Sequence, residues 1–336
     1  MKNFFFVVFL MIGFGLEAGA QVYFQNTMYS FNRFVYNPAA AGIQAPGTDY
    51  TNTLTLLGRQ QWVGIEGAPR LMSASYNTYL KDLQSGVGAY VIQDRLGPIA
   101  TTGLNVAYNY RIELNSPYSG TSAAPYISIG INGGLLQKSL NGNFVYNQDN
   151  GPDPLVPVGS FSASALVPSL GAGVYLRGAN DQFFVGLSGQ DLLEPSLESI
   201  LLTQGVGEDT DVDRSFMLMG GYRFELNTDM SLEPQVFVRT DGIFPPQVDV
   251  SVYWRYKPAV FGVNYRFFND SFSGIFGFNV LDRAFIGYSF DYGLNALNAL
   301  GDGNSHEIIV SWSFPSSDNT PRRETDIKSG NPGDIR

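Results

Sequence analysis

A strict alternation of apolar and polar residues between positions 247 and 292 constrains the fold of this chain more than any other feature. In residues 247–256 one set of alternate positions is apolar or aromatic: Val248, Val250, Val252, Trp254 and Tyr256. The intervening positions are mostly polar: Gln247, Asp249, Ser251, Tyr253 and Arg255. A period of two places successive side chains on opposite faces of a β-strand. Residues 259–267, 272–281 and 284–292 repeat the pattern across short turns, which predicts an antiparallel meander.

The polar face of these strands indicates which solvent surrounds the sheet. A soluble β-sandwich gives the same alternation, so the apolar face alone does not decide. The other face is rich in Gly, Ser, Asn, Asp and Arg, which suit the lumen of a barrel and not a packed interior. Aromatic residues such as Trp254 and Tyr256 lie near strand ends, where membrane barrels place their interfacial girdles. We therefore predict an all-β fold, a transmembrane antiparallel β-barrel.

Composition agrees with a membrane barrel. Only 15% of residues are charged and 14% are aromatic. Downstream of the N-terminus, no segment approaches the ~20 consecutive apolar residues of a transmembrane helix, so we expect strands to cross the membrane. The absence of cysteine excludes disulfides and thiol chemistry. The net charge of −10 argues against nucleic acid as a partner.

The N-terminus has the pattern of a secretory signal peptide, predicted over residues 1–20. Lys2 precedes an apolar stretch over residues 4–14, and the small residues Ala18, Gly19 and Ala20 form a cleavage site. Cleavage would remove one basic and one acidic residue, so the net charge would stay −10. Export together with alternating strands predicts the bacterial outer membrane.

Fourteen strands can be counted within a barrel domain predicted over residues 49–314. Their expected spans are 50–60, 70–80, 86–94, 100–113, 122–136, 168–177, 182–190, 215–226, 232–240, 247–256, 259–267, 272–281, 284–292 and 305–314. The long connections fall on alternate turns: 61–69, 137–167, 191–214, 241–246 and 293–304. Outer-membrane barrels have long extracellular loops, short periplasmic turns and an even number of strands. We therefore expect both termini in the periplasm.

Two segments lie outside the predicted strands. Residues 21–48 are rich in Tyr, Phe and Asn, and Pro and Gly prevent a continuous helix. This N-terminal arm is either an ordered extension or a plug in the lumen. Residues 315–336 are rich in Pro, Ser, Asn, Asp and Gly, which predicts a disordered periplasmic tail. The tail is either a solvated extension or a docking peptide for a periplasmic partner.

Little in the sequence suggests catalysis or metal binding. The single histidine, His306, adjoins Glu307, but adjacent strand residues point to opposite faces. Alternate acidic residues at 209, 211 and 213, after Glu208, resemble the start of a calcium loop. Arg214 stands where that loop needs Gly, and Gly220 where it needs Glu, so a solvated loop is favoured. We expect no enzymatic activity, no cofactor and no metal site.

The first predicted extracellular connection has the most unusual local sequence. Residues 59–64 read Arg-Gln-Gln-Trp-Val-Gly, and residues 66–69 read Glu-Gly-Ala-Pro. One interpretation places Trp62 in the aromatic girdle and Arg59 in a lumen network. The other is a recognition surface or gate, because aromatics and Arg dominate protein–protein hot spots. The candidate partner-binding residues are Arg59, Gln60, Gln61, Trp62 and Glu66.

These two segments resemble the hallmark of the PorP/SprF family, membrane proteins of the type IX secretion system. Four further segments are similar to family elements in the same order: residues 37–42 (Asn-Pro-Ala-Ala-Ala-Gly), 94–98 (Asp-Arg-Leu-Gly-Pro), 287–292 (Gly-Tyr-Ser-Phe-Asp-Tyr) and 305–308 (Ser-His-Glu-Ile). The chain departs from the usual pattern at Ala40, Phe290 and Asn304, where the family more often has an aromatic residue, Tyr and Gly. The resemblance covers residues 21–314 and leaves the tail outside.

The resemblance implies a non-enzymatic outer-membrane barrel that serves protein export or, in gliding bacteria, surface display of an adhesin. The implied partners are a secreted cargo protein with a C-terminal sorting domain, the periplasmic ring and peptidoglycan-linked parts of the machinery, and outer-membrane lipid. The loops at 59–69, 137–167 and 191–214 are the candidate contact surfaces. The alternative is a passive channel or a hydrophobic-ligand transporter, with the arm at residues 23–36 as its plug.

Overall fold

The computed structural model describes residues 25–43, 51–115, 124–144, 159–195, 212–242, 246–267, 271–281, 283–294 and 303–315. The predicted signal peptide, nearly all of the tail and three residues of the acidic cluster (Glu208, Asp209 and Asp211) lie outside these ranges.

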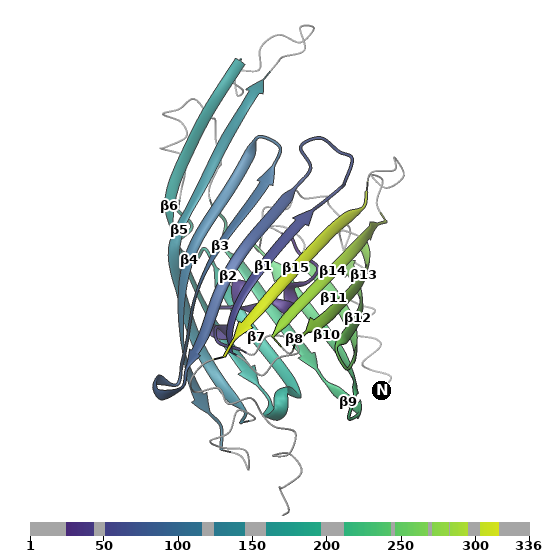
Figure 1. Ribbon diagram of the computed structural model, residues 1–336. Coiled ribbons are helices and arrows are strands. Elements are labelled where there is room, and N and C mark those ends of the chain that lie inside the picture. Colours follow the sequence, from purple (N-terminus) through teal and green to yellow (C-terminus); the bar gives the residue numbers. More distant parts are fainter. Residues whose placement is uncertain are drawn as a thin grey trace, which may run out of the picture.

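The strands form one antiparallel sheet that closes into a barrel (Figure 1). Their bounds are β1 (Asn52–Gln60), β2 (Arg70–Leu80), β3 (Ser85–Leu96), β4 (Ile99–Glu113), β5 (Tyr126–Phe144), β6 (Gly159–Arg177), β7 (Phe183–Gln190), β8 (Ser215–Tyr222), β9 (Phe224–Asn227), β10 (Met230–Thr240), β11 (Gln247–Tyr256), β12 (Ala259–Phe267), β13 (Ser271–Val280), β14 (Ala284–Gly293) and β15 (Ser305–Phe314). Strands adjacent in the sequence pair with each other except β8 and β9, and β15 pairs with β1 to close the ring.

The barrel has fourteen strands, as predicted. Both β8 and β9 pair with β10, so these two segments are one strand interrupted at Arg223. Asn52 at the start of β1 lies opposite Phe314 at the end of β15, so the barrel begins and ends at the same rim. That rim carries the short connections, including η4 (Lys81–Leu83) and η5 (Ala179–Asp181). We assign it to the periplasm and the opposite rim, with the longer loops, to the cell exterior.

The hairpin of β5 and β6 is longer than expected. Each strand has 19 residues, and their pairing extends from Tyr126↔Arg177 to Phe144↔Gly159. The predicted loop at 137–167 is therefore wrong at both ends, since residues 137–144 and 159–167 are strand. Ser, Gly, Ala and Asn fill much of these extensions, so the apolar alternation that marks a strand is weak there. Figure 1 shows this hairpin rising above the neighbouring strands.

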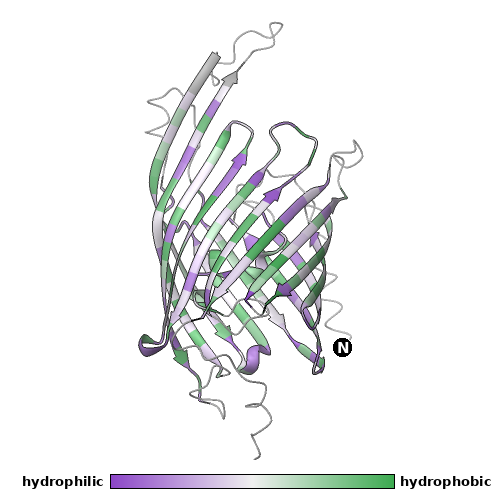
Figure 2. Ribbon diagram, viewed as in Figure 1, coloured by the Kyte–Doolittle hydropathy of each residue, from purple (hydrophilic) through white to green (hydrophobic). Residues whose placement is uncertain are grey.

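The outer face of the barrel is apolar and exposed. On β4 the outward side chains are Leu104, Val106, Tyr108, Tyr110 and Ile112, with 45–62% of each accessible. The intervening polar residues Asn105, Asn109 and Arg111 are at most 7% exposed. Figure 2 shows the resulting apolar and polar stripes along the strands. Among the described residues, no helix has the length and apolarity to cross a bilayer.

The lumen is packed, and the expectation that its polar face would not form a packed interior is wrong. Residues 25–43 of the N-terminal arm lie inside the ring of strands as three short turns: η1 (Tyr29–Phe31), η2 (Arg33–Val35) and η3 (Pro38–Ala40) (Figure 1). Almost all of these residues are buried. The arm supplies apolar side chains to a mostly polar wall. Of the two interpretations, the arm therefore has the position of a plug in the lumen.

The arm crosses the whole lumen from the extracellular end to the periplasmic end. The Thr27 backbone N–H donates to Glu307, the third residue of β15, at 2.8 Å. The Gly42 N–H donates to Asn77 near the periplasmic end of β2 at 2.9 Å. The expectation of two periplasmic termini therefore holds for the barrel strands, but the first described residue of the arm, Gln25, lies at the extracellular end beside Gln61.

Candidate functional site

The first extracellular connection, residues 61–69, is a compact loop that continues β1 into β2. The Gln61 N–H donates to the Pro69 carbonyl at 2.9 Å and so closes the base of the loop. Inside it, the Ile65 N–H donates to the Trp62 carbonyl at 3.1 Å. Gly64 and Gly67 have φ of 112° and 76°, a region that glycine enters without steric cost. This explains why the loop sequence spaces two glycines around Glu66.

Backbone hydrogen bonds join this loop to its neighbours on both sides. The Val63 N–H donates to the Asn304 carbonyl at 2.9 Å, just before β15. On the other side, the Gly97 N–H in the turn between β3 and β4 donates to the Gly67 carbonyl at 2.8 Å. The segments at 59–69, 94–98 and 304–308, which sequence comparison singled out separately, therefore form one continuous part of the extracellular rim.

Arg59 lies in the lumen beneath the loop and is 4% exposed. Its Nη1 is 2.5 Å from Oδ2 of Asp291 on β14 and 3.1 Å from Oε2 of Glu307 on β15. Buried charges persist only when they are paired and hydrogen-bonded. The lumen-network interpretation therefore describes where the Arg59 side chain is, and this side chain is not on the surface that a partner would contact.

The same two carboxylates hold the start of the arm. Glu307 accepts hydrogen bonds from the backbone N–H groups of Thr27 and Met28, each at 2.8 Å. The Thr27 hydroxyl donates to Oδ2 of Asp291 at 2.7 Å. Because each carboxylate binds both Arg59 and the arm, the end of β1 and the arm are fixed by one cluster.

A second ion pair lies beside this cluster. Nε of Arg266 on β12 donates to Oδ1 of Asp249 on β11 at 2.8 Å, and both side chains are 1% exposed. Nη2 of Arg266 also donates to the Asn26 carbonyl at 3.3 Å. We call Arg59, Asp249, Arg266, Asp291 and Glu307 the arm clamp, since each contacts the arm or a residue that does.

The other four candidate residues lie at the extracellular rim. Gln60 faces outward at the end of β1, and Gln61 donates from Nε2 to Oε1 of Gln25 in the arm at 3.4 Å. Trp62 is partly buried with φ of 43°, and its N–H donates to Oγ of Ser305 at 3.3 Å. Glu66 is exposed on the loop. The structure thus separates one buried anchor from four residues at the surface.

His306 and Glu307 point to opposite faces, as predicted. Glu307 is inside, whereas His306 faces outward, with its Nδ1 2.6 Å from the Tyr288 hydroxyl. The His306 ring also lies 5.3 Å from the Phe290 ring. His306 is therefore part of the aromatic outer surface of β14 and β15.

The periplasmic end of the arm is held by side-chain amides and by Arg111, whose Nη2 donates to the Ala41 carbonyl at 3.0 Å. Oδ1 of Asn37 accepts from the Ala39 N–H at 2.9 Å and caps η3, while its Nδ2 donates to the Val174 carbonyl on β6 at 3.1 Å. Asn109 on β4 donates to the Pro38 and Ala41 carbonyls at 3.2 and 2.9 Å. Small side chains let the arm approach the wall, since Ala39, Ala40 and Ala41 are fully buried. Ala40, where the family more often has an aromatic, fits this close packing.

The sequence analysis identified most of the residues that hold the arm only as members of motifs, and did not predict that they bind the arm. Asp291 and Glu307 lie in the segments at 287–292 and 305–308, and Asn37 lies in the segment at 37–42. Asp249 and Arg266 belong to no motif, and their only signal was a charged residue on the inward face of a strand. Among the described residues, no group of three His, Asp or Glu side chains is placed to hold a metal ion.

Comparison with known proteins connects these motifs. Residues 18–312 match the family described as type IX secretion system membrane protein PorP/SprF. The chain belongs to the PorP/SprF family. It is accordingly an outer-membrane component of the type IX secretion system. The segments that resembled family elements contribute the periplasmic end of the arm, three of the five clamp residues and the first loop. No curated protein matches the chain.

Solved structures show that the fold is that of outer-membrane barrels. The toluene transporter TbuX of Ralstonia pickettii is 11% identical, with a TM-score of 0.50, and the match covers 84% of this chain and 93% of TbuX. A FadL homologue of Pseudomonas aeruginosa is 13% identical, with a TM-score of 0.42, over 89% and 96%. Omp33 of Acinetobacter baumannii is 9% identical, with a TM-score of 0.42, over 78% and 98%. At this identity the likeness to TbuX concerns the fold alone.

Proposed function

We propose that this PorP/SprF protein acts as a non-enzymatic anchor or receiver at the cell surface for one secreted partner with a C-terminal sorting domain. The observation that carries the proposal is the packed lumen. A folded or extended cargo chain has no path through a barrel that residues 25–43 fill and the arm clamp holds. The protein belongs to a secretion-system family, and its lumen is filled. We therefore expect it to take part in secretion by binding partners on its surfaces.

The extracellular rim supports a binding role. The loop at residues 61–69 is fixed to the turn at residues 97–98 and to the segment before β15, so it presents Trp62 and Glu66 on a rigid base. A preorganised surface loses less conformational entropy on binding than a mobile one. Aromatic residues are also enriched at the centres of protein interfaces.

The connection between this rim and the arm gives the surface a fixed shape. Gln61 contacts Gln25, and Arg59, two residues earlier, binds the carboxylates that hold Thr27 and Met28. The arm therefore supports the base of the first loop from inside. On this account the motif at residues 59–64 combines a buried anchor with a surface presented to the partner.

Gene deletion and complementation test the proposal in the native organism. Deletion should remove one specific large protein from the cell surface while the other secreted proteins remain. A Trp62→Ala/Glu66→Gln variant should restore the barrel to the outer membrane but restore surface cargo only in part. The matched control is Tyr108→Ala/Gln84→Ala, which changes an outward aromatic residue and a polar residue near the periplasmic rim.

Two results would contradict the proposal. A deletion strain with an unchanged surface proteome would show that no cargo depends on this barrel. A strain that loses uptake of a small apolar solute, with all surface proteins intact, would favour the hydrophobic-ligand transporter instead. Cell-surface proteolysis followed by mass spectrometry measures the first outcome, and radiolabelled solute uptake measures the second.

A further inference from the structure

Two arginines face outward side by side near the extracellular rim. Arg70 on β2 is the direct cross-strand partner of Arg95 on β3, and both side chains are exposed. Like charges directly opposite each other destabilise a sheet. Among the described residues, no ion pair joins either guanidinium to a carboxylate. Within the described part of the chain, the two positive charges therefore have no paired carboxylate.

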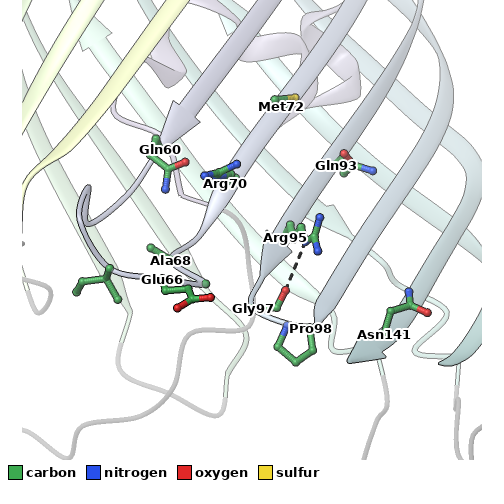
Figure 3. Close-up of a pocket in the computed structure, with 12 residues that line it drawn as sticks. Gln60, Glu66, Ala68, Arg70, Met72, Gln93, Arg95, Gly97, Pro98 and Asn141 are labelled. Carbon is green, nitrogen blue, oxygen red and sulfur yellow. Dashed lines mark hydrogen bonds between the residues drawn. The ribbon is translucent and has the colours of Figure 1, made fainter. Parts of the chain in front are cut away.

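The arginines line a pocket of about 630 Å³ on the outer surface of the barrel. Polar side chains from neighbouring strands surround them: Gln60 on β1, Gln93 on β3 and Asn141 on β5. The first loop and the turn after β3 close one end of the pocket through Glu66, Gly67, Gly97 and Pro98 (Figure 3). The pocket therefore offers guanidinium and amide donors together in a concave surface.

Backbone hydrogen bonds hold the wall of the pocket in place. The Gly97 N–H binds the Gly67 carbonyl at 2.8 Å, and the Asn141 N–H binds the Pro98 carbonyl at 2.9 Å. Nε of Arg95 donates to the Gly97 carbonyl at 3.4 Å (Figure 3). This contact uses one of the five N–H groups of Arg95 and leaves the terminal ones for a ligand.

The position of the pocket relative to the apolar band indicates the source of the ligand. Outward neighbours form rows across the strands, and the row of Gln60, Arg70 and Arg95 lies at the top. The next row contains Met72 and Gln93. The row below that is apolar, with Leu56, Ala74, Val91 and Leu104. The arginines are thus at the upper edge of the lipid-facing surface, where lipid headgroups lie.

We propose that this pocket binds the phosphate-bearing headgroup of a glycolipid of the outer leaflet. Arginine pairs with phosphate through two parallel hydrogen bonds, and basic pockets on membrane proteins recognise lipid headgroups. The acyl chains would continue down the apolar rows of β1 to β4. Glu66 lies in the same pocket and would repel a second anionic group, so we expect one phosphate of the headgroup to lie beside the two arginines.

Lipid binding by the purified barrel tests the proposal. The full chain is extracted in detergent, stripped of lipid and titrated with bis-phosphorylated lipid A, with lipid A lacking both phosphates, and with inorganic phosphate. Native mass spectrometry measures bound lipid, and thermal stability measures the effect of phosphate. We expect bis-phosphorylated lipid A to bind at least tenfold more tightly than the dephosphorylated form, and inorganic phosphate to bind weakly.

Substitutions locate the site. Arg70→Gln/Arg95→Gln should abolish the preference for the phosphorylated lipid, whereas Lys81→Gln/Lys257→Gln at the periplasmic rim removes the same charge and should retain it. Glu66→Gln should strengthen binding of the phosphorylated lipid. Heat-dependent migration in gel electrophoresis checks that each variant is folded.

Two outcomes would overturn the proposal. Equal binding of the two lipids by the native barrel, or a preference that survives in the double arginine variant, would show that the pocket does not recognise phosphate. Inorganic phosphate that binds as tightly as lipid A would show a phosphate site without a lipid, which contradicts the glycolipid source.

Discussion

At the scale of single residues, the arm clamp decides whether the lumen stays filled. Arg59, Asp291 and Glu307 are each at most 4% exposed. Removing one partner of such a buried ion pair leaves the other charge buried and unpaired. This typically lowers the free energy of unfolding by about 3–5 kcal/mol. Replacing every charge with apolar groups is often neutral, so the clamp is best understood as a device that fixes one position of the arm and not as a large source of stability.

Glu307→Gln should therefore destabilise the barrel and release the start of the arm. Glutamine keeps the size of the side chain but removes the charge that pairs with Arg59 and the second acceptor oxygen for the Thr27 and Met28 N–H groups. We expect a loss of about 3–5 kcal/mol in the free energy of unfolding, measured by urea titration in lipid vesicles. His306→Gln, the outward neighbour, is the control and should change stability by less than about 1 kcal/mol.

A glycine on the barrel wall tests how closely the arm packs. A Cβ at Gly130 on β5 would lie 2.5 Å from the Ala39 nitrogen, closer than van der Waals contact allows. Gly130→Ala should therefore cost about 1–3 kcal/mol through overpacking and expose the arm to hydrogen exchange. Gly58→Ala on β1, where no atom lies within 4 Å of the added Cβ, is the matched control. Equal exchange protection in both variants would contradict the packed arm.

At the scale of elements, the sequence predicts most strands but not what fills the ring. The spans predicted for β2, β11, β12 and β15 agree with the structure to the residue. Their outward positions are mostly apolar and alternate with inward positions that are mostly polar. The β5–β6 hairpin was too short in the prediction because small and polar residues interrupt the apolar alternation in its upper part. The alternation of apolar and polar residues marks only the part of a strand that faces lipid. It therefore does not reveal strand extensions that continue beyond the membrane.

The arm shows a second limit of sequence reasoning. Its composition allowed both an extension and a plug, because aromatic residues such as Tyr29, Phe31 and Phe34 bury equally well against any surface. Their partners are far away in the chain: Tyr29 stacks on Phe237 at 4.6 Å, and Phe31 stacks on Phe285 at 4.7 Å. Such contacts form only when the barrel has closed, so no local sequence pattern predicts them.

Deletion of residues 25–43 tests the role of the arm as an element. In planar bilayers the native barrel should show little steady conductance, because polar wall and arm are packed together. The deletion should produce stable open-channel currents, since fourteen strands enclose a lumen that the remaining inward side chains do not fill. Equal conductance of the two proteins would mean that the arm does not close the lumen.

At the scale of the whole molecule, the barrel is filled inside, and the proposed function assigns partner recognition to its outer surfaces. Its apolar wall meets lipid, and the arm fills the lumen. The motif segments at 59–69, 94–98 and 304–308 meet at the extracellular rim, whereas the one at 37–42 lies at the periplasmic end of the arm. Residues 25–43 run from that rim to the periplasmic rim, where β1 begins. A partner on either side of the membrane would therefore meet a surface connected to the arm, which is consistent with a scaffold in a secretion system.

The measurement that tests this account most directly is co-purification of the tagged barrel from native outer membranes, with partners identified by mass spectrometry. The account predicts one abundant surface protein with a C-terminal sorting domain, together with other components of the secretion system, and less of that protein with Trp62→Ala/Glu66→Gln. A barrel that is isolated alone, and that conducts small solutes with its arm in place, would contradict the account.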